Sequence, residues 1–427
     1  MFLVYKSYRL QLATTLLFFS GLLVCGKAIS QNVTSPYSTL GIGDIDTKNT
    51  GRYAISGASI SRRNSNTYND ANPASLTSLG FKLINFDITG RGRASTFQAS
   101  KSDTLSAVSK DFVLRNISLS FRPHLRSAFA FGLKPFSSVN YKYPLPDAVY
   151  NTQVKGYSRS VEGTGGINQA YGSFGYAISK KLSAGITGSY LFGSSQKNTA
   201  YYDEALYLDI KKEEYKFYSG ANVLAGLQYY TNANRQWQHT VGLTAAAGTN
   251  LKGYSKTEYV SSDSTFLEKS NGSAVFKLPI STGLGYTASN KQGLSISAEG
   301  NYYYWPKQSL NYINTYTSPS VRFSAGWEYA KIAHYYLHEA TYEKYYLGMG
   351  LTAQNSYYHL NKNKVWDYAV SFGGGYNISG SMYLHAGLEL GYKGSYTSRQ
   401  IKERYTQFTL GFTVRNMWYK LSRMDYD

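Results

Sequence analysis

The sequence predicts an all-β protein, a transmembrane antiparallel β-barrel of about fourteen strands. Three observations carry this prediction. The 427 residues include 43 Tyr and 40 Gly but only 9 Pro, a bias typical of many strands with interfacial rings and tight turns. After residue 30, no apolar stretch is long enough for a membrane-spanning helix. Instead, segments that alternate apolar and polar residues recur along the chain, and many of them run for ten residues or more.

The alternation is clearest near the two ends of the predicted barrel. Over residues 84–91, three large apolar residues alternate with polar ones, among them Asp87 and Arg91. Over residues 407–415, Phe, Leu, Phe and Val alternate with Gln, Thr and Arg. A soluble β-sandwich also alternates in this way. The length of the segments, and the charges and glycines on their polar face, favour a membrane barrel with its apolar side chains toward lipid.

We expect fourteen strands, an even number that places both chain ends on the periplasmic side. Short links then lie on that side, except for a long link at 331–342 that has room for a short helix. Long outer links are expected at 143–151, 201–214, 256–270 and 306–318. The predicted strands lie near 81–98, 108–122, 127–142, 152–178, 182–200, 215–231, 237–255, 271–288, 292–305, 319–330, 343–358, 365–377, 381–396 and 403–417.

Residues 1–30 have the features of a cleaved signal peptide. Lys6 and Arg9 precede an apolar core at Leu16–Val24, and a small-x-small cleavage site ends the segment. The alternative, a membrane anchor, would need an apolar run of about 20 residues. Cys25 is the only cysteine and falls inside this segment, so no disulfide is expected in the exported chain. Export with a barrel pattern predicts the outer membrane of a Gram-negative cell, reached through the barrel-assembly machinery.

The formal net charge is +19, which limits the class of partner. The sequence has no run of five or more Lys or Arg and no basic helix, so nucleic acid is not expected as a partner. Outer-membrane lipid and anionic lipopolysaccharide, together with arginines in the barrel lumen, account for the charge.

The chain lacks the residue patterns of an enzyme. There is no Gly-x-Ser-x-Gly elbow, no phosphate-binding loop and no dinucleotide fingerprint. His334 and His338 stand four apart, but their order relative to the nearby glutamates is not that of a zinc protease. His385 lies four residues before Glu389 without a nucleophile. We therefore expect no catalytic residues, no metal and no cofactor.

Residues 31–79 form a separate N-terminal segment before a barrel at 80–427. The part from Ser35 to Leu79 is rich in Gly, Ser, Asn and Arg and has neither a helical nor a strand period. If the rest of the chain closes into a barrel, this segment lies either outside it or within it.

Several short motifs lie in a fixed order along the exported chain. They are Ser35-Pro36-Tyr37-Ser38, Gly41-Ile42-Gly43-Asp44, Asn72-Pro73-Ala74-Ser75-Leu76, Gly163-Thr164-Gly165-Gly166-Ile167, Tyr190-Leu191-Phe192-Gly193 and Trp418-Tyr419. With these motifs the chain resembles, over nearly all of its exported part, the FadL-like (FadL/TodX) outer-membrane transporters of hydrophobic compounds. The resemblance implies a monomeric fourteen-stranded barrel whose N-terminal segment, 31–79, folds inward as a hatch. It also implies passive uptake of long-chain fatty acids or aromatic hydrocarbons, with exit through a kink in the third strand.

With the segment inside, Asn72, Pro73 and Ala74 are expected to form a turn that delivers the chain to the first strand. Charges on the polar faces of strands must be hydrated or paired inside the lumen. We expect the hatch arginines Arg52, Arg62 and Arg63 to pair with lumen carboxylates, although strand-to-strand pairs are an equal alternative. The predicted lumen charges are Asp87, Arg91, Glu299, Arg322, Glu328 and Glu389.

The third predicted strand carries a candidate lateral opening at Gly132, Lys134 and Pro135. Proline removes a ladder donor, and a closed barrel has no free edge at which that loss is harmless. A bulge or an opening is the physical expectation. Alternatively, the proline ends a short strand beyond the bilayer.

Two functions of different classes follow from the sequence. The first is a channel for passive uptake of a hydrophobic small molecule through a plugged barrel. The second is a structural or interaction barrel, such as a shuttle component of a protein secretion machine. A shared fold does not separate them.

Overall fold

The computed structural model describes residues 35–47, 49–98, 107–145, 149–151, 154–155, 158–203, 208–231, 236–261, 264–310, 315–335, 338–360, 363–396 and 400–417. The predicted signal peptide at 1–30 and the motif Trp418-Tyr419 lie outside these ranges.

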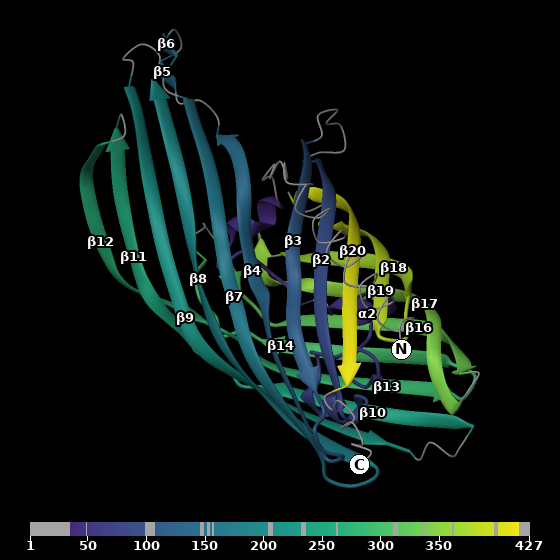
Figure 1. The fold of residues 1–427 in the computed structure, drawn as a ribbon. Helices are drawn as coiled ribbons and strands as arrows, with labels where there is room; N and C mark the ends of the chain where they lie inside the picture. The colour runs from purple at the N-terminus through teal and green to yellow at the C-terminus, as the bar shows by residue number, and fades with distance from the viewer. Residues whose placement is uncertain are drawn as a thin grey trace, which may run out of the picture. The chain divides into compact units, whose positions relative to one another are not determined.

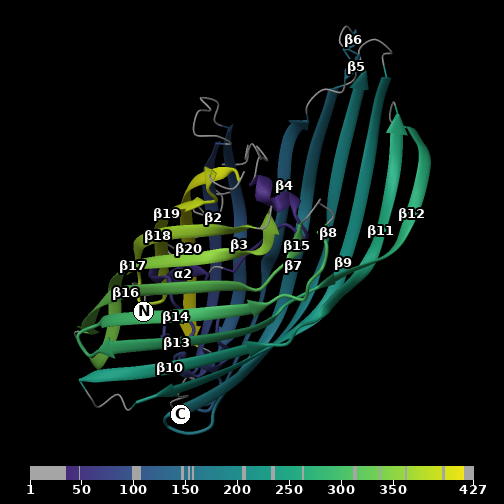
Figure 2. The same cartoon turned by 180° about the vertical axis from the view of Figure 1, so that it is seen from behind.

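Fourteen strand positions form a closed antiparallel barrel, as the sequence predicts (Figures 1 and 2). Strands that follow one another along the chain pair with each other, and β2 pairs with β20 to close the barrel. Two positions are interrupted, because β10 is followed by β11 and β12 by β13. The strands are β2 (Leu83–Gln98), β3 (Ala107–Phe121), β4 (Ser127–Leu145), β7 (Ser158–Ala177), β8 (Leu182–Asp203), β9 (Leu208–Tyr230), β10 (Trp237–Ala246), β11 (Asn250–Ser261), β12 (Ser264–Lys277), β13 (Ile280–Asn290), β14 (Leu294–Tyr304), β16 (Ser320–Tyr335), β17 (His338–Leu360), β18 (Asn363–Asn377), β19 (Met382–Lys393) and β20 (Lys402–Met417), with the short strands β5 (Val149–Asn151), β6 (Val154–Lys155) and β15 (Tyr316–Thr317) between them.

Side chains alternate between an apolar outer surface and a polar lumen. Phe112 and Leu284 point outward and are 74% and 59% exposed, whereas Asn85, Ser120 and Ser183 point inward and are fully buried. This arrangement is the reverse of a soluble core and is that of a transmembrane barrel. Among the described residues, no helix has the length and apolar character needed to cross a membrane.

Four predicted links are wrong in their described residues. The link at 331–342, expected to have room for a helix, is strand there, because β16 and β17 run through it. The described residues of the outer links expected at 143–151, 201–214 and 256–270 are also strand, in β4, β5, β8, β9, β11 and β12. The stretches at 201–214, 256–270 and 331–342 carry polar and charged residues on both faces, so they lack the apolar alternation by which a lipid-facing strand is found.

Strands β4, β7, β8, β9, β11 and β12 continue beyond the ends of their neighbours as a curved sheet (Figures 1 and 2). We call this extension the wall; it comprises residues 137–145, 158–167, 192–203, 208–219, 251–261 and 264–276 of β4, β7, β8, β9, β11 and β12. Within the described residues, β12 pairs with β11 alone, and the upper half of β4 pairs with β7 and β1 but not with β3.

The described N-terminal residues 35–79, here called the lumen segment, pack against inward-facing side chains of the barrel. Leu40 and Ile42 share an apolar cluster with Leu191, Tyr218 and Leu251 of the strands. The helix α2 contacts β16 to β20, and the helix η2 contacts β4, β7, β8 and β9. The elements of the segment are η1 (Pro36–Thr39), β1 (Asp44–Ile45), α2 (Gly51–Ser56) and η2 (Pro73–Ser78).

Candidate functional site in the barrel lumen

A buried cluster of opposite charges joins the lumen segment to the barrel. Arg52 of α2 ion-pairs with Glu328 of β16, and its Nη1 binds Glu343 Oε1 of β17 at 2.6 Å. Arg62 Nη2 binds the same Glu328 Oε1 at 2.5 Å. The ring of Tyr346 lies 4.0 Å from the Arg52 guanidinium carbon. All four charged residues of this network, two from the lumen segment and two from the barrel, are buried, so their attraction is weakly screened.

The charge state of Arg52 follows from these neighbours. Burial lowers the pKa of Arg52, but Glu328 and Glu343 raise it more, so its pKa stands well above the ordinary value. Arg52 therefore stays charged at any pH at which the protein is folded. Removing one partner of such a buried pair leaves an uncompensated charge, at a cost of about 3–5 kcal/mol.

Glu299 and Arg322 bind backbone groups of the lumen segment. Glu299 Oε2 accepts from the amides of Ser59 at 2.6 Å and Ile60 at 2.9 Å. Arg322 Nη1 donates to the carbonyl oxygen of Thr47 at 2.7 Å. These bonds satisfy backbone groups that an irregular buried segment cannot pair within itself.

Asn72-Pro73-Ala74 lies against the inner surface of β7, β8 and β9. Asn72 caps η2, since its Oδ1 accepts from the amide of Ala74 at 3.0 Å, and its Nδ2 donates to the carbonyl oxygen of Ile60 at 2.9 Å. Gly226 of β9 allows this approach: a Cβ there would lie 2.1 Å from Asn72 Oδ1. The motif is therefore a capped turn packed against the barrel.

The ladder between β3 and β4 is short. The two strands pair only over Ile117–Phe121 and Phe129–Leu133. Pro135 comes two residues later, at a register shift in the pairing of β4 with β7. Because proline has no N–H to donate, the ladder cannot continue regularly through this position.

The strand β1 of the lumen segment occupies the position that β3 leaves. Asp44 lies opposite Ser138 of β4, and Ile45 lies opposite Ser137. The amide of Asp46 donates to the carbonyl oxygen of Phe136 at 2.9 Å. On the other side, Arg115 Nη2 of β3 binds Asp46 Oδ1 at 2.7 Å. The lumen segment thus bridges β3 and β4 from inside the barrel.

Gly132 and Lys134 lie at the lower edge of this break. The ring of Tyr171 covers Gly132, and its hydroxyl donates to Asn116 Oδ1 of β3 at 3.1 Å. Lys134 Nζ binds Asp70 Oδ2 of the lumen segment at 2.7 Å. Burial raises the pKa of Asp70, but Lys134 and further neighbours lower it more, so its pKa stands below the ordinary value.

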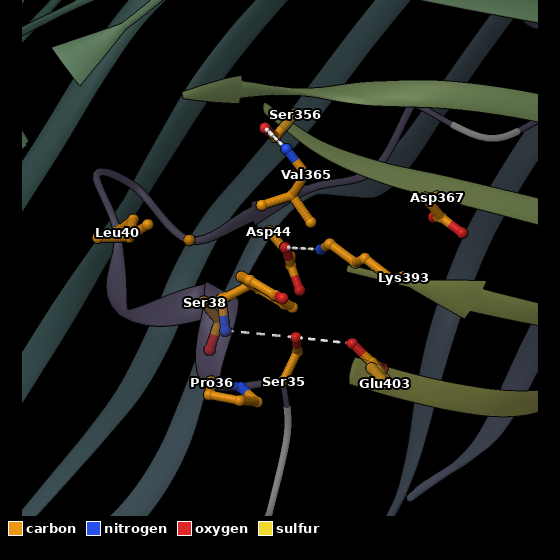
Figure 3. Close-up of polar contacts among 12 residues, drawn as sticks. Ser35, Pro36, Ser38, Leu40, Asp44, Ser356, Val365, Asp367, Lys393 and Glu403 are labelled. Atoms are coloured by element: carbon orange, nitrogen blue, oxygen red, sulfur yellow. Dashed lines mark hydrogen bonds and ion pairs between the residues drawn. The ribbon is translucent and has the colours of Figure 1, made fainter. Parts of the chain in front are cut away.

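The start of the lumen segment is tied to the last strands of the barrel (Figure 3). Ser35 Oγ donates to Glu403 Oε2 of β20 at 2.9 Å, and Lys393 Nζ of β19 binds Asp44 Oδ1 at 2.8 Å. In Figure 3, Asp367 of β18 lies beyond Lys393. The start of the segment is therefore held to the last two strands of the barrel, next to the seam between β20 and β2.

Two cavities lie on either side of β1. The larger has a volume of about 290 Å³ and is lined by hydroxyl, amide and charged groups, with Tyr303, Trp305 and Phe136 among the aromatic ones. The smaller, of about 80 Å³, lies beside the break and is lined by Asp111, Arg115 and Pro135. Both cavities share Asp44 and Ile45, so β1 forms the partition between them.

A family model matches almost the whole chain. The model of the BamG family matches residues 13–425. The chain belongs to the BamG family. No curated protein sequence matches it.

Solved structures share the fold of this BamG-family chain. A Pseudomonas aeruginosa FadL homologue superposes with a TM-score of 0.59 at 10% identity, covering 88% of this chain and all of that one. The Ralstonia pickettii toluene transporter TbuX gives a TM-score of 0.55 at 14% identity, covering 87% and 99% of the two chains. The Pseudomonas putida toluene transporter TodX gives 0.54 at 14% identity, covering 88% and 99%. The resemblance to FadL-like transporters is thereby confirmed at the level of the fold.

The remaining predicted charges of the BamG-family chain have other partners. Arg63 donates to Gln228 Oε1 at 2.8 Å and Thr77 Oγ1 at 2.9 Å, and burial lowers its pKa to about 10. Asp87 accepts from Thr413 of the neighbouring strand, and Arg91 binds Asp111 of β3 at 3.5 Å. Glu389 is buried on β19, opposite Ser371 and Gln407. The geometry combines segment-to-barrel contacts with the strand-to-strand contacts that the sequence left as the alternative.

Sequence reasoning missed several of the groups that hold the lumen segment. Glu343 lies at the first residue of a predicted strand, where the alternation does not decide whether its side chain points to the lumen or to lipid. Gln228 is fully buried on an inward position of β9, and counting by twos along that strand could have found it. The pair of Asp46 and Arg115 had no signal, because nothing in their spacing indicates that they meet.

Proposed function

We propose that the chain is an outer-membrane channel for passive uptake of small hydrophobic molecules, with lateral exit between β3 and β4. The break in that ladder above Leu133 carries the proposal, because there β4 lacks its pairing with β3 beside a lumen cavity. The fold supports it, since toluene transporters share the fold. As proposed, the chain acts without catalytic residues, metal or cofactor, and as a monomer.

In this proposal the lumen segment is a hatch and β1 is its gate. A ligand in the 290 Å³ cavity reaches the smaller cavity and the break only if β1 moves, because β1 separates the two. A short ladder to β4 and one ion pair each at Asp44 and Asp46 hold β1. We expect these contacts to yield before the buried cluster in which Arg52 and Arg62 share Glu328. Opening would then be a local movement of residues 44–46, with the rest of the hatch fixed.

The cavity favours a compact ligand. An apolar cavity of about 150 Å³ holds benzene, so 290 Å³ has room for a substituted aromatic ring. The polar lining offers no continuous apolar tunnel for a long alkyl chain. We therefore favour single-ring aromatic compounds over long-chain fatty acids.

Cross-linking β1 to β4 tests the proposal. The double variant Ile45→Cys/Ser137→Cys places two cysteines opposite each other in the ladder, where oxidation can join them by a disulfide. The exported chain is expected to have no other cysteine. Uptake of labelled toluene into proteoliposomes should stop on oxidation and return on reduction. Ser137→Cys alone is the control and should respond to neither treatment. Unchanged uptake through the cross-linked protein would refute lateral exit past β1.

The wall favours a second candidate function, that of an interaction barrel. Six strands extend beyond the apolar belt with polar groups on both faces, which a lateral transport path does not require. Under this hypothesis, native mass spectrometry of the detergent-purified protein would find a stoichiometric protein partner. A small hydrophobic ligand in the lumen would instead favour transport.

A further inference from the structure

The wall has two chemically different faces. Its inner face continues the lumen surface, because Leu191, Tyr218 and Leu251 are buried against the lumen segment. Successive side chains of a strand point to opposite faces, so every second residue above these three lies on the inner face. The register of the strands then assigns each residue of the wall to a face.

The inner face is basic. Glu214 is the one carboxylate among the side chains described on this face. The cations described on it are Arg159, Lys197, Lys212, Lys216 and Lys269. Lys212 Nζ binds Glu214 at 2.6 Å, and Lys197 Nζ lies 3.6 Å from it. On the described part of this face the cations outnumber the carboxylates by five to one, so this part carries a net positive charge.

Tyrosines lie between these cations. Tyr141 and Tyr143 of β4 stack with ring centroids 5.8 Å apart. Tyr201 of β8 and Tyr259 of β11 lie on the same face further across the sheet. One inner row runs from Tyr143 through Val161, Thr199, Lys212 and Tyr259 to Leu267.

The outer face carries both signs, because Lys142, Lys211 and Lys256 lie on it together with several carboxylates. One row across all six strands contains Glu162, Glu213, Glu258 and Glu268, with Lys142 and Asn198. Lys142 binds Glu162 at 3.1 Å, and Lys256 binds Glu258 at 2.5 Å. Like charges on facing strands are unfavourable. Solubility alone is served by a mixture of both signs, as on the outer face, so the excess of cations on the inner face points to a ligand there.

We propose that the inner face of the wall binds an anionic polysaccharide. Lysine is depleted at protein–protein interfaces, which disfavours an acidic protein as the partner of this Lys-rich face. Sugar rings pack on tyrosine faces through their C–H groups, while tyrosine hydroxyls and lysines bind hydroxyl and carboxylate groups. The site is distinct from the proposed channel, since none of the cations and tyrosines named for it lines either cavity or pairs with β1.

Binding of oligogalacturonate to the purified full-length protein in a non-ionic detergent tests this inference. The inner-face variant Lys197→Gln/Lys212→Gln/Lys269→Gln should weaken binding about tenfold or more through lost charge-assisted bonds. The control Lys142→Gln/Lys211→Gln/Lys256→Gln removes the same charge from the outer face of the same sheet and should change binding less than about twofold.

A second pair of measurements separates a sugar site from general attraction of anions. Tyr143→Leu/Tyr259→Leu should weaken oligogalacturonate binding while leaving the weak binding of polyglutamate unchanged. The inference is overturned if oligogalacturonate does not bind, or if both lysine variants lose equal affinity. The inference is also overturned if polyglutamate binds as tightly as oligogalacturonate and the tyrosine variant binds each of them with unchanged affinity. That result would indicate an acidic protein partner.

Discussion

At the scale of single residues, Glu328 is the centre of the contacts between lumen segment and barrel. It accepts from both Arg52 and Arg62, which lie ten residues apart in the segment. The sequence indicated that arginines of the segment would face carboxylates of the lumen, because buried charges need partners. It did not indicate which carboxylate, since the segment has no period from which to derive its position.

Replacing Glu328 with Gln should loosen the lumen segment. Arg52 and Arg62 would lose a shared buried partner, at a cost of about 3–5 kcal/mol. We expect higher single-channel conductance in planar bilayers and faster trypsin cleavage after Arg62 and Arg63.

The control for this variant is Glu162→Gln. Glu162 forms an exposed pair with Lys142 on the outer face of the wall. Such pairs contribute about 0–1 kcal/mol, so the control should match the unmodified protein. Equal conductance and equal cleavage of the two variants would contradict an anchoring role for Glu328.

At the scale of elements, close contact between the lumen segment and strand backbones depends on glycine. Gly326 of β16 is an example: a Cβ there would lie 1.9 Å from the carbonyl oxygen of Ser56. The high glycine content predicted many strands and tight turns, yet these two positions, Gly226 and Gly326, serve contact with η2 and α2. A glycine on the polar face of a strand carries no signal that separates these roles.

Gly226→Val should displace Asn72 and the start of η2 from β9. The added side chain would overlap Asn72 Oδ1, and the bond from Asn72 Nδ2 to Ile60 would be lost with it. We expect the barrel to remain folded, as judged by circular dichroism, while hydrogen exchange in residues 60–78 becomes faster.

Gly188→Val is the matched control, because nothing lies within 4 Å of a Cβ at that position of β8. It changes the same residue type in the next strand and should leave exchange in the segment unaltered. If Gly226→Val also leaves exchange unaltered, the packing of Asn72 on β9 does not hold η2 in place.

At the scale of the whole molecule, the barrel was predictable and the wall was not. Lipid requires one apolar face on each spanning strand, which leaves a clear alternation in the sequence. Beyond the apolar belt both faces meet water, so β11 and β12 resembled polar loops. An irregular ladder at Pro135 was predictable from the missing donor, but the pairing of β1 with β4 beside it was not.

Shortening the wall should leave the barrel intact. Strand β10 pairs with β13 and with β9 through ladders that contain no residue of β11 or β12. Replacing residues 253–274 with a short Gly-Ser turn should therefore preserve the folded barrel band in unheated gels and toluene uptake. Loss of the folded band would show that the wall is needed for folding.

The position of the lumen segment also constrains the order of assembly. The segment leads directly into β2, and β2 closes the barrel with β20, the last strand to be synthesised. Ser35, Asp44 and Arg52 bind partners on β16, β17, β19 and β20, near the other end of the chain. Once the seam has closed, the segment has no route into the lumen except along its axis. We therefore expect the segment to meet the late strands before the seam closes, acting as an internal template for the final strand pairing.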